Sequence, residues 1–326
     1  MELLILDSQE VKQCVTYQDA LDAAEIAFRA YAQGGAVMPS KVYLPLEIYQ
    51  GDLRAMPAYL KDLDICGIKW VNSHPANQAL GLPTVMALVI LNNPKTGQPI
   101  AMMDGTHLTS MRTGSAGALA SQCMAPPDAA ILALVGSGVQ AHYQLRAHME
   151  IFSLKEVRVW SGDAKSANTF LEAYRDSKIT IRKTETIRDC VQGAHIICTT
   201  TPSTQALLQP EDLTRPVHIN AIGADAPGKQ ELDPRILKQA AVVVDDWLQA
   251  SHGGEINQAV AKGLFSKEDL YCSLGDLVIG KKSLSADKNR ISVFDSTGLA
   301  IQDMALAKMV YMRAREQGLG KAMTIA

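Results

Sequence analysis

The segment ILALVGSGVQAHYQL, residues 131–145, constrains the fold of this chain more than any other feature. An apolar run, typical of a strand buried on both faces, ends at Gly136 and leads directly into a helical pattern. Gly136, Gly138 and Ala141 have the spacing of the first strand-to-helix turn in a doubly wound α/β sheet. The first glycine permits a tight bend, and the second lets a pyrophosphate approach the backbone. The segment therefore predicts a dinucleotide-binding site.

Strand and helix patterns continue to alternate after this turn. We expect them to form an α/β, Rossmann-type doubly wound dinucleotide-binding domain over residues 119–304. Before the turn, short apolar stretches between residues 41 and 103 alternate with Gly, Pro and Asn, which predicts a mainly antiparallel sheet. Residues 16–33 form a helical pattern that Thr16 and Asp19 can cap. Residues 1–118 with 305–326 are expected to form a smaller α+β domain that includes the last helix.

Composition excludes several classes of protein. The 326 residues carry a net charge of −3, without the basic excess that a nucleic-acid-binding protein usually shows. The apolar runs are far shorter than the roughly 20 residues of a membrane span, and the first residues lack the features of a signal peptide. The six cysteines are scattered without metal-ligand spacing. We therefore expect a reduced, cytoplasmic protein without a metal site.

The coenzyme that the turn would bind stays open between NAD and NADP. An acidic residue about 20 positions after the turn commonly holds the ribose 2′-hydroxyl of NAD. Ser161 stands at that position, and Asp163 follows two residues later. Lys165 could meet a 2′-phosphate, or it could be an ordinary solvated charge at a helix start.

A second group of residues suggests an anionic substrate. Lys69 lies between Ile68 and Trp70, and a cation inside an apolar strand is costly unless an anion meets it. Lys41, Arg54 and Arg112 also lie near strand ends or helix starts, although any one of these residues could simply point into water. Together the four cations predict a carboxylate-binding pocket, because arginine recognises carboxylates bidentately and a buried lysine can transfer protons.

Asp225 is a third candidate. It follows a strand and Gly223, in a turn that ends with Pro227 and Gly228. Ligands of α/β domains usually bind at the carboxyl ends of the strands, which favours a functional aspartate, although aspartate is also common in structural turns.

Eight blocks in order resemble the ornithine cyclodeaminase/mu-crystallin family over nearly the whole chain. They are MPSK, GIKWVNSHP, MRTGSAGALA, VGSGVQA, NAIGADAPGKQEL, GEINQAV, LGDLVIGKK and FDSTGLAIQD. The resemblance implies a homodimer, a substrate-binding and dimerisation domain from both ends of the chain, and a central domain that binds NAD(H) or NADP(H). Members include ornithine cyclodeaminase, alanine dehydrogenase, cyclic imino acid and ketimine reductases, and a thyroid-hormone-binding crystallin.

The resemblance also implies roles for residues at matching positions. Arg112 and Lys41 look like ligands of the substrate carboxylate, Lys69 like the group that polarises the carbonyl or imine, and Asp225 like the general acid/base. The positions implied for the cofactor are Gly136, Gly138, Val139 and Gln140 in the turn, with Thr113 and Thr200 as further candidates.

Arg54 departs from the pattern of the ornithine cyclodeaminases, which have a glutamate at this position. A cation there would repel the distal ammonium of ornithine. The sequence therefore predicts an NAD(P)-dependent oxidoreductase acting on the C–N bond of a small α-amino or α-imino acid, resembling alanine dehydrogenase or a Δ1-pyrroline-2-carboxylate or ketimine reductase. The alternatives are an ornithine cyclodeaminase and a non-catalytic ligand-binding protein of the mu-crystallin kind.

Overall fold

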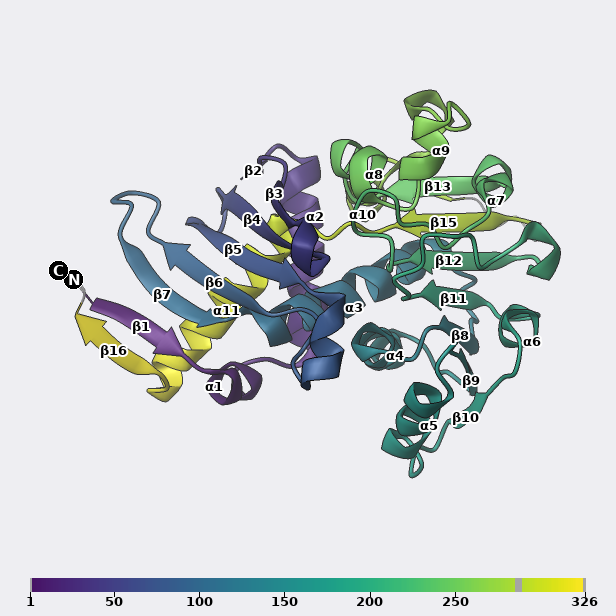
Figure 1. Ribbon diagram of the computed structural model, residues 1–326. Helices are drawn as coiled ribbons and strands as arrows, with labels where there is room; N and C mark the ends of the chain where they lie inside the picture. Colours follow the sequence, from purple (N-terminus) through teal and green to yellow (C-terminus); the bar gives the residue numbers. More distant parts are fainter. Residues whose placement is uncertain (1, 285–288, 325–326) are drawn as a thin grey trace. The chain divides into compact units, whose positions relative to one another are not determined.

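The computed structural model describes residues 2–284 and 289–324 of the chain (Figure 1). The chain divides into two compact units, which we describe one at a time. The first unit comprises Met1–Arg112 and Leu299–Ala326, and the second comprises Thr113–Gly298. The role of each unit stays a prediction.

The first unit is built on a sheet with the strand order β16-β1-β7-β6-β5-β4-β2, and β3 also pairs with β4. Neighbouring strands from β3 to β7 are antiparallel, which confirms the sheet predicted between residues 41 and 103. The elements are β1 (Glu2–Leu6), α1 (Ser8–Gln13), α2 (Tyr17–Ala32), β2 (Ala36–Val37), β3 (Val42–Leu46), β4 (Gly51–Leu60), β5 (Ile65–Ser73), β6 (Ala87–Asn92), β7 (Pro99–Asp104), α3 (Gly105–Met124, which continues into the second unit), α11 (Ala300–Gln317) and β16 (Lys321–Thr324).

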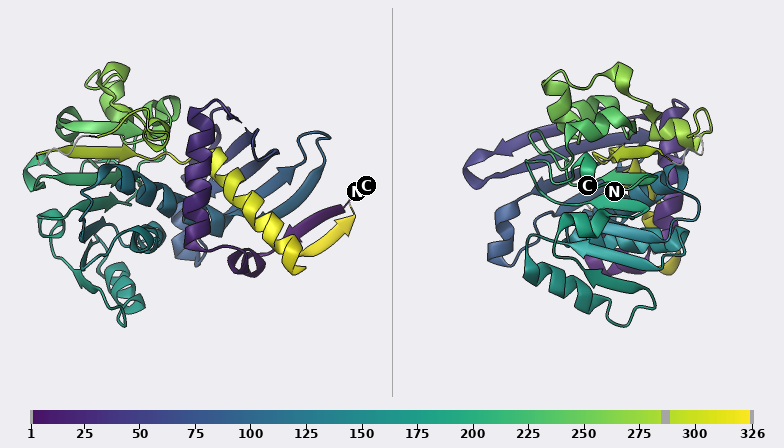
Figure 2. Two further views of the ribbon diagram at one scale, coloured as in Figure 1. Left: turned by 180° about the vertical axis from the view of Figure 1, so that it is seen from behind. Right: turned by 90° about the vertical axis from the view of Figure 1, so that its right-hand side faces the viewer.

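Two long helices lie against this sheet. The predicted capping box of Thr16 and Asp19 begins α2, whose Ala27 and Phe28 are fully buried. Helix α11 packs against α2 and against β4, β5 and β6 (Figure 2). Helix α11, near the end of the chain, therefore packs its side chains against β5 of this sheet.

The second unit is a parallel sheet with the order β10-β9-β8-β11-β12-β15-β13-β14. This order, with β8 at the turning point, confirms the predicted Rossmann-type fold. Its elements are β8 (Ile131–Val135), α4 (Val139–Ile151), β9 (Glu156–Trp160), α5 (Ala164–Ala173), β10 (Thr180–Lys183), α6 (Ile187–Val191), β11 (Ile196–Thr199), β12 (Val217–Ala221), α7 (Pro234–Gln239), β13 (Ala240–Val244), α8 (Trp247–Gly253), α9 (Asn257–Ala261), β14 (Cys272–Ser273), α10 (Leu274–Val278) and β15 (Ile291–Asp295).

Strand pairing between the two ends of the chain escaped sequence analysis. β1 and β16 are antiparallel neighbours, with Leu3 opposite Met323. The residues of β16 are exposed, so that no alternation of apolar and polar positions marks this strand. Within the described residues, no helix has the length and apolar character that a membrane crossing needs.

An ion pair between α2 and α11 generates a prediction about stability. Arg313 donates to both carboxylate oxygens of Asp19 at 2.6 and 2.8 Å, and these bonds lower the pKa of Asp19 to about 2. A lowered carboxyl pKa stabilises the fold above the unfolded value of 3.8, and this contribution disappears as the pH falls through about 2. We expect Asp19→Asn to reduce the free energy of unfolding in urea by about 1–2 kcal/mol at pH 7.

The matched control is Asp22→Asn on the same helix, where the side chain is exposed and a change within about 0.5 kcal/mol is expected. The difference between the two variants should shrink below pH 4. Equal stabilities at pH 7 would contradict the assigned contribution of the Asp19–Arg313 pair.

Candidate functional site

The glycine turn after β8 has a geometry that only glycine satisfies well at its first position. Gly136 has a φ of +115°, and a Cβ there would lie 2.5 Å from the Thr200 Oγ1 atom. The backbone of Thr200 is itself fixed, since its N–H donates to the Val135 carbonyl at 2.9 Å. The ends of β8 and β11 are therefore packed directly against each other at the turning point of the sheet.

Gly138 creates open space at the start of a helix. It is the N-cap of α4, with no side-chain cap, and apart from Gly138 and its two chain neighbours no described heavy atom is found within 4 Å of the position a Cβ would take. Val139 begins the helix and is 64% exposed. Next to it, the Gln140 Oε1 atom is buried without a hydrogen-bond partner in the described part of the chain. Uncapped helix N–H groups beside an open backbone position suit a phosphate, so the residues present fit a dinucleotide.

The end of β9 presents polar groups for the nucleoside side of such a ligand. Ser161 follows β9, and its hydroxyl accepts the Asp163 N–H at 3.2 Å. Asp163 caps α5 by accepting the Lys165 N–H at 2.9 Å, and both of these side chains are exposed. Thr113 lies in α3, where its carbonyl accepts the Gln144 amide at 3.1 Å.

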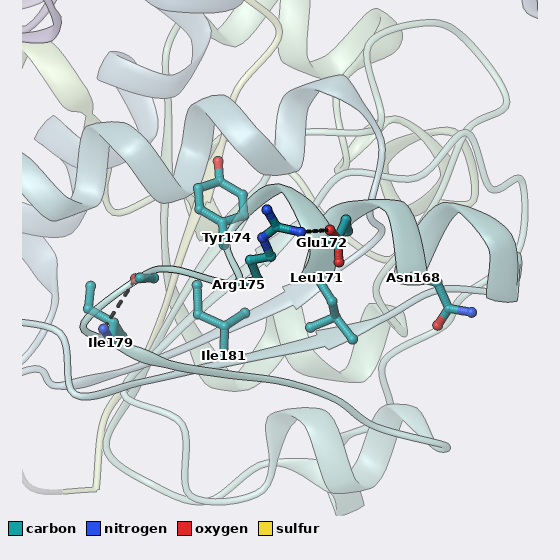
Figure 3. A pocket seen from close by; sticks show the side chains of 8 residues that line it. Asn168, Leu171, Glu172, Tyr174, Arg175, Ile179 and Ile181 are labelled. Carbon is teal, nitrogen blue, oxygen red and sulfur yellow. Dashed lines mark hydrogen bonds and ion pairs between the residues drawn. The ribbon is translucent and has the colours of Figure 1, made fainter.

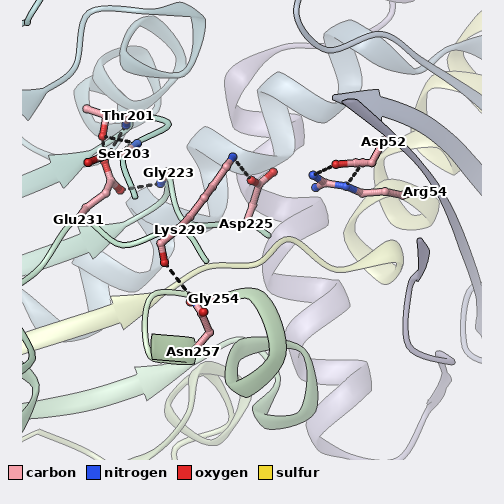
Figure 4. A network of polar contacts seen from close by, with 10 residues as sticks. All are labelled: Asp52, Arg54, Thr201, Ser203, Gly223, Asp225, Lys229, Glu231, Gly254 and Asn257. Carbon is pink, nitrogen blue, oxygen red and sulfur yellow. Dashed lines mark hydrogen bonds and ion pairs between the residues drawn. The ribbon is translucent and has the colours of Figure 1, made fainter. Parts of the chain in front are cut away.

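A buried glutamate, missed by sequence analysis, joins the loops that follow β11 and β12 (Figure 4). The carboxylate of Glu231 accepts hydrogen bonds from Thr199 Oγ1, from the N–H and Oγ1 of Thr201, and from the Gly223 N–H, at 2.7–2.9 Å. Glu255 in turn accepts the backbone N–H of Glu231 at 2.9 Å. Burial, followed by the neighbouring Glu231 charge, raises the pKa of Glu255 well above its usual value.

Asp225 lies two residues beyond Gly223, whose N–H donates to Glu231. Its carboxylate accepts the Lys229 ammonium at 2.6 Å, and the Asp225 side chain is 33% exposed (Figure 4). Thr200 follows β11 and Asp225 follows β12, so both lie at the carboxyl edge of the parallel sheet, where Asp225 was predicted. Asp225 and Lys69 belong to different units, so their cooperation stays a prediction.

In the first unit, Lys69 is fully buried and bonded to Asp303, a residue that sequence analysis did not single out. The Lys69 Nζ atom lies 2.8 and 2.7 Å from the two carboxylate oxygens of Asp303 on α11. The Arg112 Nε atom on α3 donates to the same Asp303 carboxylate at 3.2 Å. The structure therefore brings two of the predicted site residues together on one buried carboxylate.

This environment lowers the pKa of Lys69 to about 7. Burial is the largest cause, and the positive charges of Arg112 and Lys41 add to it, whereas the charge and hydrogen bond of Asp303 oppose it. Lys69 is thus placed to change protonation near neutral pH, as an acid/base group requires.

Arg54 is paired with a neighbouring aspartate, and its role as a substrate ligand stays a prediction. On β4, its Nε and Nη2 atoms donate to the two carboxylate oxygens of Asp52 at 2.6 and 3.0 Å, and its guanidinium lies over the Tyr43 ring at 5.2 Å. Asp52 therefore offsets much of the Arg54 charge. The expected repulsion of a distal ammonium is weaker than the sequence alone implies.

A surface hollow between α5 and β10 lies apart from the predicted site residues (Figure 3). It is lined by Tyr174 and Ile181 among others, and its Arg175 is paired with Glu172 at 2.6 Å. None of the predicted site residues lines it.

Among the residues that the structure describes, no group of three or more His, Cys, Asp or Glu side chains could hold a metal ion.

The strand order and the glycine turn define a Rossmann-type protein with a second, sheet-based unit that carries a buried cation cluster. Comparison with known proteins narrows this class. The chain belongs to the ornithine cyclodeaminase/mu-crystallin family, whose model matches residues 1–318.

Three relatives illustrate the match. Alanine dehydrogenase of Archaeoglobus fulgidus is 47% identical over 322 residues, covering 98% of each chain. The structure of an archaeal alanine dehydrogenase dimer with bound NAD superposes with a TM-score of 0.96, at 46% identity and 100% coverage of both chains. Thermococcus litoralis Δ1-pyrroline-2-carboxylate reductase, in complex with NADH and L-proline, gives a TM-score of 0.95 at 30% identity, covering 98% of this chain and 99% of that chain.

The two turn glycines generate a paired prediction. Gly138→Ala should leave the free energy of unfolding within about 0.5 kcal/mol, because the Cβ enters open space at a φ of −75°. It should nevertheless weaken NADH binding at least tenfold, because the methyl group occupies the phosphate approach. Gly136→Ala should weaken both binding and stability, the latter by about 1–3 kcal/mol.

Fluorescence titration with NADH and urea unfolding measure the two quantities separately. Unchanged NADH affinity in Gly138→Ala would show that the dinucleotide does not pass over this turn.

Proposed function

We propose that this chain is an NAD-dependent alanine dehydrogenase, which converts pyruvate, ammonium, NADH and a proton into alanine, NAD⁺ and water, and back. The observation that carries the proposal is the 47% identity to an alanine dehydrogenase over 98% of the chain. At the coarser level, the chain is an oxidoreductase of α-amino or α-imino acids. The first unit would bind the substrate and the second unit the dinucleotide.

Cations of the first unit would recognise the substrate carboxylate. Arg112, held at Nε by Asp303, would bind the pyruvate carboxylate, and Lys41 would add positive potential. Arg54, already bonded to Asp52, would contribute less to this recognition.

Proton transfer falls to Lys69 and Asp225. In its ammonium form, Lys69 would donate a hydrogen bond to the carbonyl or imine, which makes the adjacent carbon a better hydride acceptor. Asp225, whose carboxylate is held by Lys229, would take the protons that the nitrogen loses as ammonia adds. When bound, NADH supplies the hydride to that carbon, and NAD⁺ accepts it in the reverse direction.

A cyclic imine is the second candidate substrate. It is favoured by the TM-score of 0.95 with a reductase complexed with NADH and L-proline. Ornithine cyclodeamination remains a third candidate, because Asp52 offsets the Arg54 charge that had argued against a diamino acid. Non-catalytic binding is disfavoured by the presence of Lys69, Arg112 and Asp225 together.

The test is NADH and NADPH oxidation at 340 nm with pyruvate plus ammonium, with Δ1-pyrroline-2-carboxylate, and with each omitted in turn. We expect turnover with pyruvate plus ammonium and NADH. For this direction, kcat/KM should fall as the pH rises through about 7, because Lys69 loses its proton there; alanine oxidation should rise over the same interval.

Lys69→Met and Asp225→Ala should each lower kcat at least 100-fold while NADH affinity stays unchanged. Turnover only with the cyclic imine would replace alanine dehydrogenation by the second candidate. No turnover with either substrate, or proline formation from ornithine instead, would refute the proposed reaction.

The first unit also carries a surface suited to a homodimer. On the sheet face opposite Lys69, Trp70 pairs with Leu88 and Ile68 pairs with Ile90. Trp70 is 41% and Leu88 48% exposed, which is unusual for large apolar side chains near the centre of a sheet. An archaeal alanine dehydrogenase of the same fold is a dimer, which supports the proposal that this face meets a second copy.

Light scattering after gel filtration tests this assembly. The 35.2 kDa chain should elute with a mass of about 70 kDa, whereas Leu88→Glu should yield monomers because a charge cannot be buried there unpaired. Met312→Glu, at an exposed position on α11, is the matched control and should remain dimeric. A monomeric wild type, or a dimeric Leu88→Glu variant, would refute the proposed interface.

A further inference from the structure

The cluster around Lys69 contains one carboxylate bonded to two cations. Asp303 Oδ1 lies 2.8 Å from Lys69 Nζ and 3.2 Å from Arg112 Nε. Lys69 and Asp303 are completely buried, and Arg112 is 7% exposed. The three side chains come from β5, α3 and α11, so their spacing is set by the packing of three elements rather than by one flexible loop.

We propose that Asp303 is a positioning residue that couples substrate binding to the charge of Lys69: a carboxylate bound at Arg112 leaves Asp303 to Lys69, which then takes up a proton from solvent. The inference rests on the proposed function, which places a substrate carboxylate at Arg112. The step is a simple protonation, in which neutral Lys69, the bound carboxylate and one proton give a Lys69 ammonium in the complex.

Electrostatics gives the direction of this coupling. The charged form of Lys69 is disfavoured by burial, by Arg112 and by Lys41, and it is favoured by Asp303. A substrate carboxylate adds a second anion to the cluster and offsets the repulsion from Arg112 and Lys41. The pKa of Lys69 therefore rises on binding from its free value of about 7.

The charged groups around Lys69 come from several elements of the first unit. Arg112 faces Lys69 from α3, Asp303 faces it from α11, and Lys41 acts from the segment before β3. On the neighbouring strand β4, Arg54 belongs to the same sheet face, but Asp52 offsets its charge. A monoanionic substrate bound at Arg112 would offset the repulsion that Arg112 and Lys41 exert on a charged Lys69.

The coupling would serve the reaction directly. Hydride transfer to an imine needs a proton donor, and the donor becomes charged only when a carboxylate substrate is in place. Without substrate, the buried cluster avoids the cost of a second full positive charge beside Arg112.

Isothermal titration calorimetry tests the proposal with oxamate, an isostere of pyruvate, added to the enzyme–NADH complex. Titrations at pH 8 in buffers of different ionisation enthalpy give the number of protons taken up. We expect more than about half a proton per site in the wild type and none in Lys69→Met. Asp303→Asn removes the anion that favours charged Lys69, so its uptake should be smaller at pH 8 and should peak at lower pH.

The matched control is Lys238→Met, which removes an exposed lysine paired with Asp269 and should keep the wild-type uptake. As a second readout, kcat should fall at a higher pH than kcat/KM, because kcat reports the substrate complex and kcat/KM reports the free enzyme. Coincident falls, no proton uptake by the wild type between pH 7 and 9, or equal uptake in Lys69→Met would overturn the coupling.

The outcome is distinguishable from failure of the proposed function. Pyrrole-2-carboxylate, a planar analogue of cyclic imino acids, serves as a second probe. Proton uptake with either probe but no turnover of any substrate supports the coupling and refutes the proposed reaction. Failure of both probes to bind overturns the coupling, because no carboxylate then reaches Arg112.

Discussion

The burial of the Lys69 side chain against Asp303 is the interaction on which the candidate active site depends. Lys69 on β5 reaches Asp303 on α11, 234 residues later in the chain. A buried ion pair of this kind contributes little to stability compared with apolar side chains of similar size, while losing one partner leaves a costly unpaired charge. The arrangement is therefore better explained by chemistry than by stability, and it requires the last helix to pack on the sheet from the first third of the chain.

Local signals in the sequence were sufficient to predict the Rossmann-type fold and the geometry of its glycine turn. The turn at Gly136 and Gly138 follows a strand and begins a helix within one short segment, and its geometry follows from backbone constraints that residue types reveal directly. Lys69 was also accessible to this reasoning, because a cation inside an apolar strand demands a partner.

The residues that bond to these side chains could not be predicted from the sequence. Asp303 stands in a pattern that resembles an ordinary helix start, and nothing near it in sequence indicates that it bonds to Lys69 and Arg112. Glu231 shows the same limitation, since its four donors come from the last residue of β11 and from the loops after β11 and β12. Both sets of hydrogen bonds depend on packing between segments that are separated in the sequence. For Arg54, the pairing with Asp52 two residues earlier on the same strand was overlooked, although opposite charges at this spacing lie on one sheet face.

One physical reason separates the residues that the sequence predicts from those that it does not. Phosphate recognition uses backbone geometry, which short patterns encode, whereas tuning an acid/base group uses charge and burial, which only the folded chain assembles. Resemblance to the family, to which the chain belongs, suggested what patterns could not: that Arg112, Lys69 and Asp225 act in one reaction, which stays a prediction.

The most direct test of the central claim is a titration of Lys69 itself. NMR of protein with ¹³C-labelled lysine, with the Lys69 signal assigned by its loss in Lys69→Met, follows the Cε chemical shift with pH. The account predicts a midpoint near 7 in the free protein, about three pH units below an exposed lysine. A Lys69 signal that stays in the charged form up to pH 10 would contradict it.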